Sequence, residues 1–210
     1  MNEILVNRSR GVLMIISAPS GAGKTSISRE ILRMFPDVHF SVSFTTRPPR
    51  SGEVNGKDYH FISEEAFRER ISRGEFVEWV ENYGQLYGTS KKTMDVFLEQ
   101  GDDLILDIEP RGAKAIREHY PRGVFVFILP PSLFELKIRL LKRGESTAVM
   151  ERRLKTSLDE IREAHWYDYI IFNEKLDAAV EQFRAIYIAE KSRRDRCLER
   201  IEAFFSDQIF

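Results

Sequence analysis

The residues with the clearest chemical potential form the stretch SAPSGAGKTS, which follows the apolar run GVLMII. Gly21 and Gly23 let backbone N–H groups approach phosphate oxygens without interference from a Cβ atom. The ammonium of Lys24 can reach the β- and γ-phosphates of a nucleotide, and the hydroxyl of Thr25 can ligate Mg²⁺. An apolar strand, a glycine-rich turn and a helix in this order predict a loop that holds a triphosphate.

One position departs from the pattern G-x-x-x-x-G-K-[ST], because Ala18 stands where the first glycine is usual. Alanine tolerates the β and bridge regions, so the loop survives the change unless this position needs a positive φ. A glycine loop that contains Gly-Lys by chance is the alternative, but the flanking strand and helix favour phosphate binding. We expect the whole loop to bind ATP: Ala18, Pro19, Ser20, Gly21, Ala22, Gly23, Lys24, Thr25 and Ser26.

A carboxylate at the end of a neighbouring strand commonly accompanies such a loop. Asp107 in LILDIE occupies that position. We expect it to hold a water of Mg²⁺ or to order the loop, with Thr25 as the other candidate metal ligand. The alternative role for Asp107 is an N-cap for the helix that follows. Glu109 lies two residues further on, where the chain leaves the strand.

Bulk composition limits the classes of function. A chain of 210 residues suits one α/β domain with insertions, and its formal net charge of −1 gives no global basic field for nucleic acid or a membrane. We expect neither a signal peptide nor a membrane span. Cys197 is the only cysteine and the four histidines lie far apart, so we expect no histidine metal site and a reducing, cytoplasmic location.

Short apolar runs predict buried parallel strands, and helical patterns separate them. The runs cover residues 12–17, 103–108, 123–129 and, more weakly, 168–173. The helical patterns cover residues 25–35, 111–120 and 132–143. This alternation predicts an α/β fold with a doubly wound parallel sheet.

The region from His39 to Tyr87 departs from this alternation. Short alternating pieces surround TTRPPRSGEVNG, which predicts a small antiparallel insert on the parallel core. The polar, arginine-rich stretch KRGESTAVMERRLK looks irregular and is a candidate mobile lid, which we expect to be helical. We expect a core of residues 1–38, 93–136 and 158–210, an insert of residues 39–92 and a lid of residues 137–157.

The C-terminal part from Leu176 onward predicts one very long helix. A helix of about 30 residues would run about 45 Å. Because that length overshoots a domain of this size, we expect the apolar end IEAFFSDQIF to pack against another subunit in a homo-oligomer. The apolar stripe comprises Val180, Phe183, Ile186, Tyr187, Cys197, Leu198, Ile201, Phe204 and Phe205.

Two arginines in the insert are suited to bind a second phosphate. Arg47 and Arg50 flank two prolines, which stiffen the loop and fix where the guanidinium groups point. Two such groups that converge suit a phosphate monoester, and Tyr59 and Tyr87 can donate hydroxyls to it or cover a base. A solvated basic loop is the alternative if this stretch is taken alone.

With these motifs in order after the phosphate loop, the chain resembles the guanylate kinases from about Gly11 to Lys191. The resemblance rests on SVSFTTRPPRSGEVNGKDYHF, FVEW, YGTS, LILDIEPRGA, FILPPS, the RG…RRL lid and DYIIFNEKLDAA. It implies transfer of the γ-phosphate of ATP, with Mg²⁺ as cofactor, to GMP and to dGMP. No nucleic acid or membrane partner is implied.

The resemblance assigns the acceptor site. It implies that the GMP phosphate pocket comprises Ser43, Arg47, Arg50, Tyr59 and Tyr87, with Asp107 at the junction with the donor. Glu78 and Thr89 correspond to the guanine readers: a carboxylate accepts from N1–H and N2–H₂ of guanine, and a hydroxyl donates to O6. Adenine lacks both donors, so such a site rejects it. The alternatives are a polar strand position for Glu78 and a helix N-cap for Thr89.

The resemblance also assigns catalytic residues. They are Lys24, Arg47, Asp107, Arg143 and Arg153. Lid arginines, Arg139 included, are expected over the phosphates, where they neutralise charge on the transferring group. A solvated helical charge is the alternative for each of them, and Arg152 is expected to point elsewhere.

Three features depart from the family pattern. Glu109 replaces an aspartate, Arg111 replaces a glutamine, and the lid after Arg143 is shorter than usual. Two other functions stay open. One is a non-catalytic guanylate-kinase-like domain that binds phosphorylated peptides, against which the intact phosphate loop argues. The other is a P-loop kinase for a phosphorylated sugar, against which Glu78 with Thr89 argues.

Overall fold

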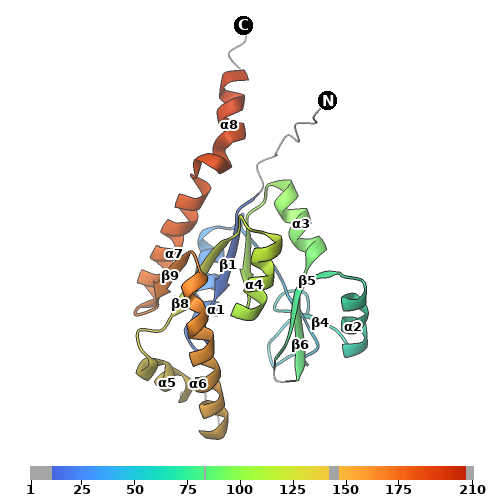
Figure 1. Cartoon of the computed structure of the whole chain (residues 1–210), viewed down its shortest axis with the longest axis vertical. Coiled ribbons are helices and arrows are strands. Elements are labelled where there is room, and N and C mark those ends of the chain that lie inside the picture. The colour runs from blue at the N-terminus through green and yellow to red at the C-terminus, as the bar shows by residue number, and fades with distance from the viewer. Residues whose placement is uncertain (1–10, 83, 142–146, 207–210) are drawn as a thin grey trace.

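The computed structural model describes residues 11–82, 84–141 and 147–206, which form two sheets surrounded by helices (Figure 1). The strands are β1 Leu13–Ser17, β2 His39–Phe40, β3 Phe44–Thr45, β4 His60–Phe61, β5 Phe76–Asn82, β6 Gln85–Ser90, β7 Leu104–Asp107, β8 Val124–Leu129 and β9 Tyr169–Phe172. The helices are α1 Lys24–Met34, α2 Glu64–Ser72, α3 Lys91–Gln100, α4 Pro110–His119, α5 Leu133–Leu141, α6 Thr147–Arg162, the 3₁₀ turn η1 Glu163–Trp166, α7 Leu176–Lys191 and α8 Arg194–Ser206.

The main sheet is parallel throughout, with the strand order β2-β7-β1-β8-β9. Alternate residues of β1 face two different apolar cores. Met14 and Ile16 pack with residues of α1 and α7, whereas Leu13 and Ile15 pack with residues of α3 and α4. The predicted doubly wound parallel sheet is therefore confirmed, and each of the four predicted apolar runs forms one of its strands.

The small sheet has the order β4-β3-β6-β5, and its strand pairing corrects two expectations. First, β3 pairs with β4 in parallel, so the sheet is mixed and not wholly antiparallel. Second, His39 and Phe40, which we expected in the insert, form β2 and pair with β7 of the main sheet. The alternating pattern of HFSVSF is shared by two strands that belong to different sheets.

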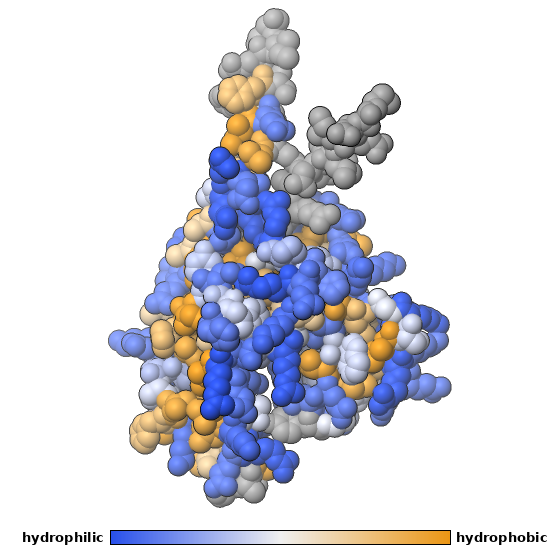
Figure 2. All heavy atoms as spheres, viewed as in Figure 1, coloured by the Kyte–Doolittle hydropathy of each residue, from blue (hydrophilic) through white to orange (hydrophobic). Residues whose placement is uncertain are grey.

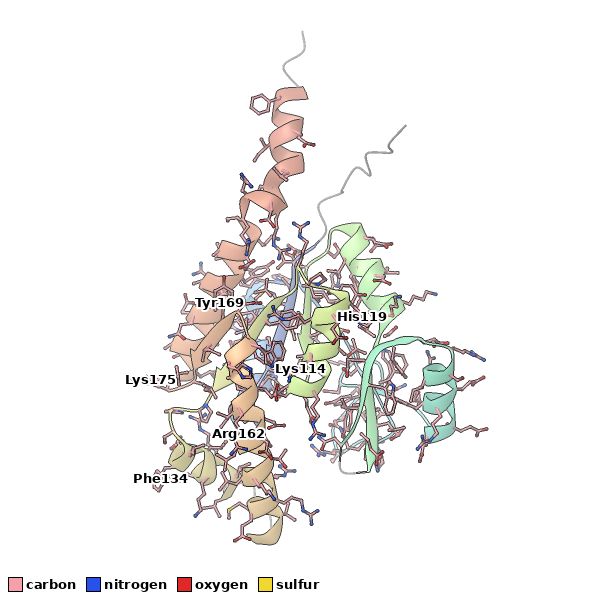
Figure 3. All side chains as sticks on the ribbon, in the orientation of Figure 1. Lys114, His119, Phe134, Arg162, Tyr169 and Lys175 are labelled. Atoms are coloured by element: carbon pink, nitrogen blue, oxygen red, sulfur yellow. The ribbon has the colours of Figure 1, made fainter. Side chains whose placement is uncertain are left out.

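The lid region is helical, as the expected fold class has it. The stretch KRGESTAVMERRLK, which looked irregular by its sequence, is helical from Thr147 onward, as the first half of α6. Residues 142–146, Arg143 among them, lie outside the described residues. Helix α5 packs its Leu136 and Leu140 against Met150 of α6, and these contacts join the two lid helices. The apolar ring of Phe134 is 74% exposed and points outward from α5 (Figure 3).

The C-terminal part is two helices, so the prediction of one long helix is wrong. Helix α7 ends at Lys191, and the N–H and Oγ of Ser192 both bond to the carbonyl of Ile188. Helix α8 is then oriented by ion pairs at its first turn. Asp195 pairs with Arg122, and Arg196 lies 3.7 Å from the buried carboxylate of Glu190.

The two halves of the predicted apolar stripe have different surroundings. Val180, Phe183 and Tyr187 of α7 are buried against the main core. Leu198, Ile201 and Phe205 of α8 are exposed, and α8 extends away from the sheets with apolar surface along it (Figures 1 and 2). No helix in the described part of the chain is long and apolar enough to cross a membrane.

Candidate functional site

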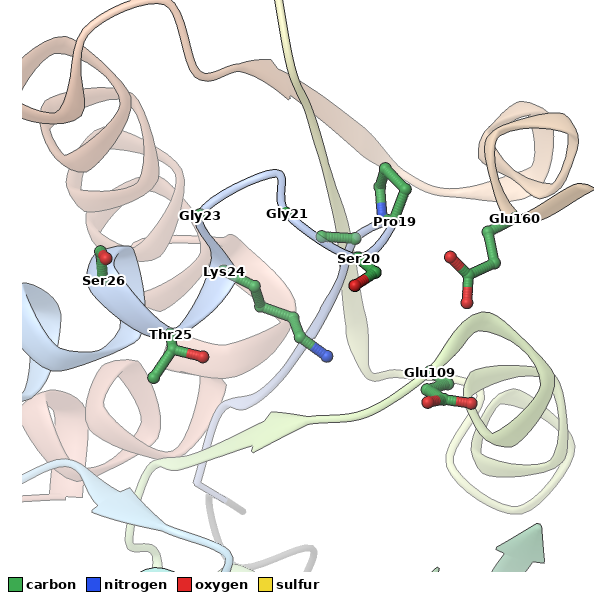
Figure 4. A pocket seen from close by; sticks show the side chains of 10 residues that line it. Pro19, Ser20, Gly21, Gly23, Lys24, Thr25, Ser26, Glu109 and Glu160 are labelled. Carbon is green, nitrogen blue, oxygen red and sulfur yellow. The ribbon is translucent and has the colours of Figure 1, made fainter. Parts of the chain in front are cut away.

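The glycine-rich loop lies between β1 and α1, at the carboxyl end of the central strand. Eight of the nine residues predicted to bind ATP line one pocket, together with Glu109 and Glu160, while Ala22 is buried (Figure 4). Gly21 and Gly23 have backbone φ values of 94° and 99°, which residues with a Cβ atom rarely adopt. Ala18 is only 6% exposed and belongs to the apolar core, so its methyl group is accommodated where the motif has glycine.

The loop is held from the far edge of the sheet. The amide of Asn173, which follows β9, donates to the carbonyl of Ala22 at 2.7 Å. Arg139 of α5 reaches the same carbonyl at 3.4 Å and the Asn173 carbonyl at 3.1 Å. A Cβ on Gly23 would lie 2.3 Å from the Asn173 amide nitrogen, so this glycine permits the contact. Arg139, expected over the phosphates, is instead bonded to the backbone that supports the loop.

Lys24, the first residue of α1, forms an ion pair with Asp107, the last residue of β7, which lies beside β1 in the sheet. Lys24 also donates to the carbonyl of Ile108 at 3.2 Å. Burial would lower the pKa of Lys24, but the charge and hydrogen bond of Asp107 outweigh it and raise that pKa above its usual value. Lys24 therefore stays protonated and positively charged in the pocket. The N-cap of α4 is Glu109, so the alternative role of Asp107 as a helix cap is wrong.

Glu78 and Thr89 meet across the antiparallel pair β5–β6, where they are direct register partners. The Thr89 hydroxyl donates to a Glu78 carboxylate oxygen at 2.6 Å, and both side chains are buried, Glu78 being 8% exposed. Burial raises the pKa of Glu78 to about 7, Thr89 opposes this rise and Glu109 adds to it. Ser90, and not Thr89, caps α3, because its side chain accepts the Thr93 N–H.

Helix α4 packs directly against the Glu78 carboxylate. A Cβ on Gly112 would lie 2.5 Å from Glu78 Oε2, so only glycine allows helix and carboxylate to approach this closely. One turn earlier, Glu109 accepts from the Asn82 amide of β5 at 2.5 Å. The segment after β7 therefore connects the phosphate loop to the pocket around Glu78.

The arginine-proline loop, residues 47–50, is ordered by Glu53, an acid that was not predicted from the sequence. Arg47 donates through both terminal nitrogens to Glu53, at 2.8 and 2.9 Å, and its guanidinium lies 5.3 Å from the Tyr59 ring centroid. The Arg50 N–H also donates to Glu53, at 2.6 Å. Arg47 is therefore held in place, whereas the side chain of Arg50 is exposed.

The remaining predicted acceptor residues lie around this loop. Tyr59 and Tyr87 have ring centroids 6.0 Å apart, and both are half-buried. Burial, and after it the charge of Asp107, raises the pKa of Tyr59, so this ring lies within electrostatic reach of the donor carboxylate. Ser43 precedes β3, and its carbonyl accepts the His60 N–H at 2.8 Å.

The lid arginines are only partly described. Arg143 lies outside the described residues. Arg153 is half-buried on α6 and interacts with other residues, and Arg152 is exposed.

Besides Glu53, sequence reasoning missed Asn173 and Glu160. The sequence did contain a signal for Glu53, because this acid lies in the same short loop as Arg47 and Arg50. No local pattern marks the other two, because each reaches the phosphate loop from more than 100 residues away along the chain.

The donor set suits a magnesium ion that arrives with the nucleotide. Thr25 supplies a hydroxyl oxygen and Asp107 a carboxylate oxygen, which are hard ligands. Among the described residues there is no group of three or more His, Cys, Asp or Glu side chains that could hold a metal ion. This fits Mg²⁺, which keeps several waters and takes its other ligands from phosphates.

Comparison with known proteins identifies the family. A family model described as guanylate kinase matches residues 10–190. The guanylate kinase of Syntrophus aciditrophicus is 56% identical over 95% of this chain and 97% of its own, and that of Geobacter metallireducens is 50% identical over 94% and 98%. The crystal structure of guanylate kinase from Anaplasma phagocytophilum superposes with a TM-score of 0.75 at 32% identity, covering 90% of each chain. This chain belongs to the guanylate kinase family.

Proposed function

We propose that this chain transfers the γ-phosphate of ATP to GMP and to dGMP, giving ADP and the nucleoside diphosphate. The observation that carries the proposal is the buried Glu78–Thr89 pair, which α4 connects to the phosphate loop. A carboxylate without a cation beside it is suited to two adjacent N–H donors. Guanine presents such a pair at N1 and N2, and adenine does not.

The donor is held by backbone N–H groups of the loop and by Lys24, whose charge Asp107 maintains. Mg²⁺, held by Thr25 and through water by Asp107, would neutralise charge on the β- and γ-phosphates. The positive end of α1 adds to this attraction.

The acceptor phosphate is proposed to bind Arg47, Arg50, Tyr59, Tyr87 and Ser43. Arg47 is oriented by Glu53 and needs little rearrangement, which lowers the entropic cost of binding. No general base is required, since the acceptor oxygen is already anionic. Arg153 and Arg143 are proposed to stabilise charge on the transferring group as the lid closes and excludes water.

A coupled assay of ADP release tests this function. Purified protein with ATP and Mg²⁺ is offered AMP, GMP, dGMP, CMP and UMP. We expect turnover with GMP and dGMP that exceeds turnover with AMP by at least about 10³-fold, because AMP leaves the buried carboxylate unpaired. Equal use of AMP and GMP, or no turnover with any acceptor, would contradict the proposal.

The two alternative functions are disfavoured. A phosphopeptide-binding domain has no need for the Lys24–Asp107 pair, and a sugar-phosphate kinase has no need for the Glu78–Thr89 pair. Calorimetric titration with ATP separates the first alternative, and the acceptor screen separates the second.

We further propose that the protein is cytoplasmic, as the single cysteine Cys197 suggests, and that it forms a homo-oligomer through α8. The exposed apolar side chains of α8 support the second proposal, since ion pairs hold its first turn in a fixed direction. Light scattering at micromolar concentration tests it. A monomeric mass would contradict it.

A further inference from the structure

Glu160 is the acidic residue of α6 that is turned toward the phosphate loop. Its carboxylate lines the triphosphate pocket beside Ser20, and Figure 4 shows it on the same side of the pocket as Glu109. The backbone N–H of Ser20 faces this carboxylate and stabilises its charged form, which lowers its pKa. One carboxylate oxygen, Oε2, is buried and has no hydrogen-bond partner among the described residues.

The neighbouring acids on the same segment behave differently. Asp159 pairs with Arg162 at 2.8 Å, and Glu163 pairs with Lys114 of α4 at 2.5 Å. Glu160 forms no ion pair within the part of the chain that the structure describes. A half-buried carboxylate without a cation is costly, so its contact with the loop calls for a reason beyond holding α6 in place.

The charges around Glu160 come from three elements. Burial is the main cause that raises its pKa, to about 7, and Glu109 of α4 adds to the rise. The Ser20 N–H lowers it, as do the positive charges of Lys24 on α1 and Arg111 on α4. Arg111 is the residue that stands in place of the family's glutamine, so this chain places an additional cation near the carboxylate.

Ser20, the loop residue whose N–H faces Glu160, adjoins the turn of the phosphate loop. Ser20 directly precedes Gly21, whose φ of 94° sets the turn that aims the following N–H groups at phosphate. On the other side, a Cβ at Gly21 would lie 3.3 Å from Leu136 and Leu140 of α5. Both lid helices therefore touch this turn, α5 through apolar side chains and α6 through a carboxylate.

We propose that Glu160 is a positioning residue for the donor nucleotide, which accepts the Ser20 N–H and so couples the lid helix α6 to the phosphate-binding turn. The proposal deepens the proposed kinase function and rests on it only for the identity of the donor as ATP. Glu160 acts through the loop backbone. What it supplies is an acceptor oxygen at a fixed place, a function that a neutral amide oxygen can also perform.

The test measures binding of Mg·ATP by calorimetry in the absence of any acceptor. The variants are Glu160→Ala, Glu160→Gln and the adjacent control Asp159→Asn, each with GMP affinity and melting temperature measured alongside. We expect Glu160→Ala to weaken ATP binding about tenfold, because a charge-assisted hydrogen bond to the turn is lost. Glu160→Gln should stay within about threefold of the unmodified protein, since it keeps the acceptor oxygen.

Asp159→Asn should bind ATP normally, and GMP affinity should be the same in all four proteins. Normal ATP binding by Glu160→Ala would overturn the proposal, and so would equal losses in the Ala and Gln variants. Equal weakening of ATP and GMP would point to a merely structural role and would also overturn it. Because the readout needs no turnover, a protein that fails to phosphorylate GMP could still show the expected ATP pattern.

Discussion

The phosphate loop and the pocket around Glu78 each have a carboxylate carried by a strand, Asp107 at the end of β7 and Glu78 within β5, but the surroundings of the two charges are opposite. Asp107 is paired with Lys24, whose pKa is raised. Within the described part of the chain, the carboxylate of Glu78 accepts a hydrogen bond from the Thr89 hydroxyl and has no cationic partner, and its pKa is raised to about 7. The difference fits the ligands proposed for the two sites. A triphosphate needs a cation in place before it arrives, whereas a base edge that carries two N–H donors needs a group that only accepts.

The supports of the two sites differ as well. The donor loop follows a strand that is buried on both faces of a five-stranded parallel sheet. The base pocket lies in a four-stranded sheet with two strands of only two residues. The comparison suggests that triphosphate binding depends on the core of the molecule, and that base selection depends on a smaller unit that can change with less effect on stability.

Removal of the cation should have the largest effect. Lys24→Met takes the positive charge from the phosphates and leaves Asp107 unpaired, so we expect kcat to fall about 10³-fold or more. Steady-state kinetics at saturating ATP and GMP measure this, with melting temperature as the control for folding. A Lys24→Met variant that keeps a tenth of the activity would show that the phosphate loop does not depend on this cation.

Neutralising the base-pocket carboxylate should affect one substrate. Glu78→Gln replaces one acceptor oxygen by an amide that clashes with the N–H donors of guanine, so kcat/KM for GMP should fall about 10²-fold. The affinity for ATP, measured without acceptor, should be unchanged. If ATP binding weakened in parallel, the two sites would not be separable in the way proposed here.

The same substitution should stabilise the protein without nucleotide above neutral pH. Because the folded-state pKa of Glu78 is raised from 4.5 to about 7, the folded form retains a proton that the unfolded form releases, and stability is lost as pH rises between these values. Glu78→Gln lacks this loss. The free energy of unfolding of the variant minus that of the unmodified protein should therefore be larger at pH 8 than at pH 5, by on the order of 2 kcal/mol. Urea unfolding at both pH values measures the change, and a pH-independent difference would contradict the argument.

A smaller effect is expected where a charge pair only orients a side chain. Glu53→Gln keeps an acceptor for Arg47 but loses the ion pair, so we expect KM for GMP to rise about tenfold with kcat less affected. The exposed pair Arg68–Glu64 on α2 supplies a control, since Glu64→Gln should leave both parameters unchanged. A fall in kcat alone would assign Glu53 to the chemical step and not to orientation.

The sequence was most informative where a residue pattern is local. Apolar runs located the parallel strands, and the glycine-rich loop was visible from the consecutive residues Ala18 to Thr25. Local patterns failed where long-range contacts decide the outcome. Two residues of an alternating pattern, His39 and Phe40, pair with the free edge of β7. Helix α7 ends at Lys191, because hydrogen bonds at Ser192 and ion pairs at the start of α8 redirect the chain.

Site residues follow the same rule. The pair Arg47 and Arg50 was visible from its own short loop, whereas Glu78 and Thr89 came from the family motifs. Asn173 and Glu160 were missed because their contacts with the phosphate loop depend on how β9 and α6 pack against it, which no spacing in the sequence records.

The six-residue segment from Asp107 to Gly112 contacts both the phosphate loop and the pocket around Glu78. Asp107 maintains the charge of Lys24, Glu109 bonds to Asn82, and Gly112 makes room for the carboxylate of Glu78. A shift of this short segment in response to one nucleotide is therefore transmitted to the other. Donor and acceptor should bind with mutual dependence, and by thermodynamic reciprocity the factor by which ATP alters the affinity for GMP equals the factor by which GMP alters the affinity for ATP.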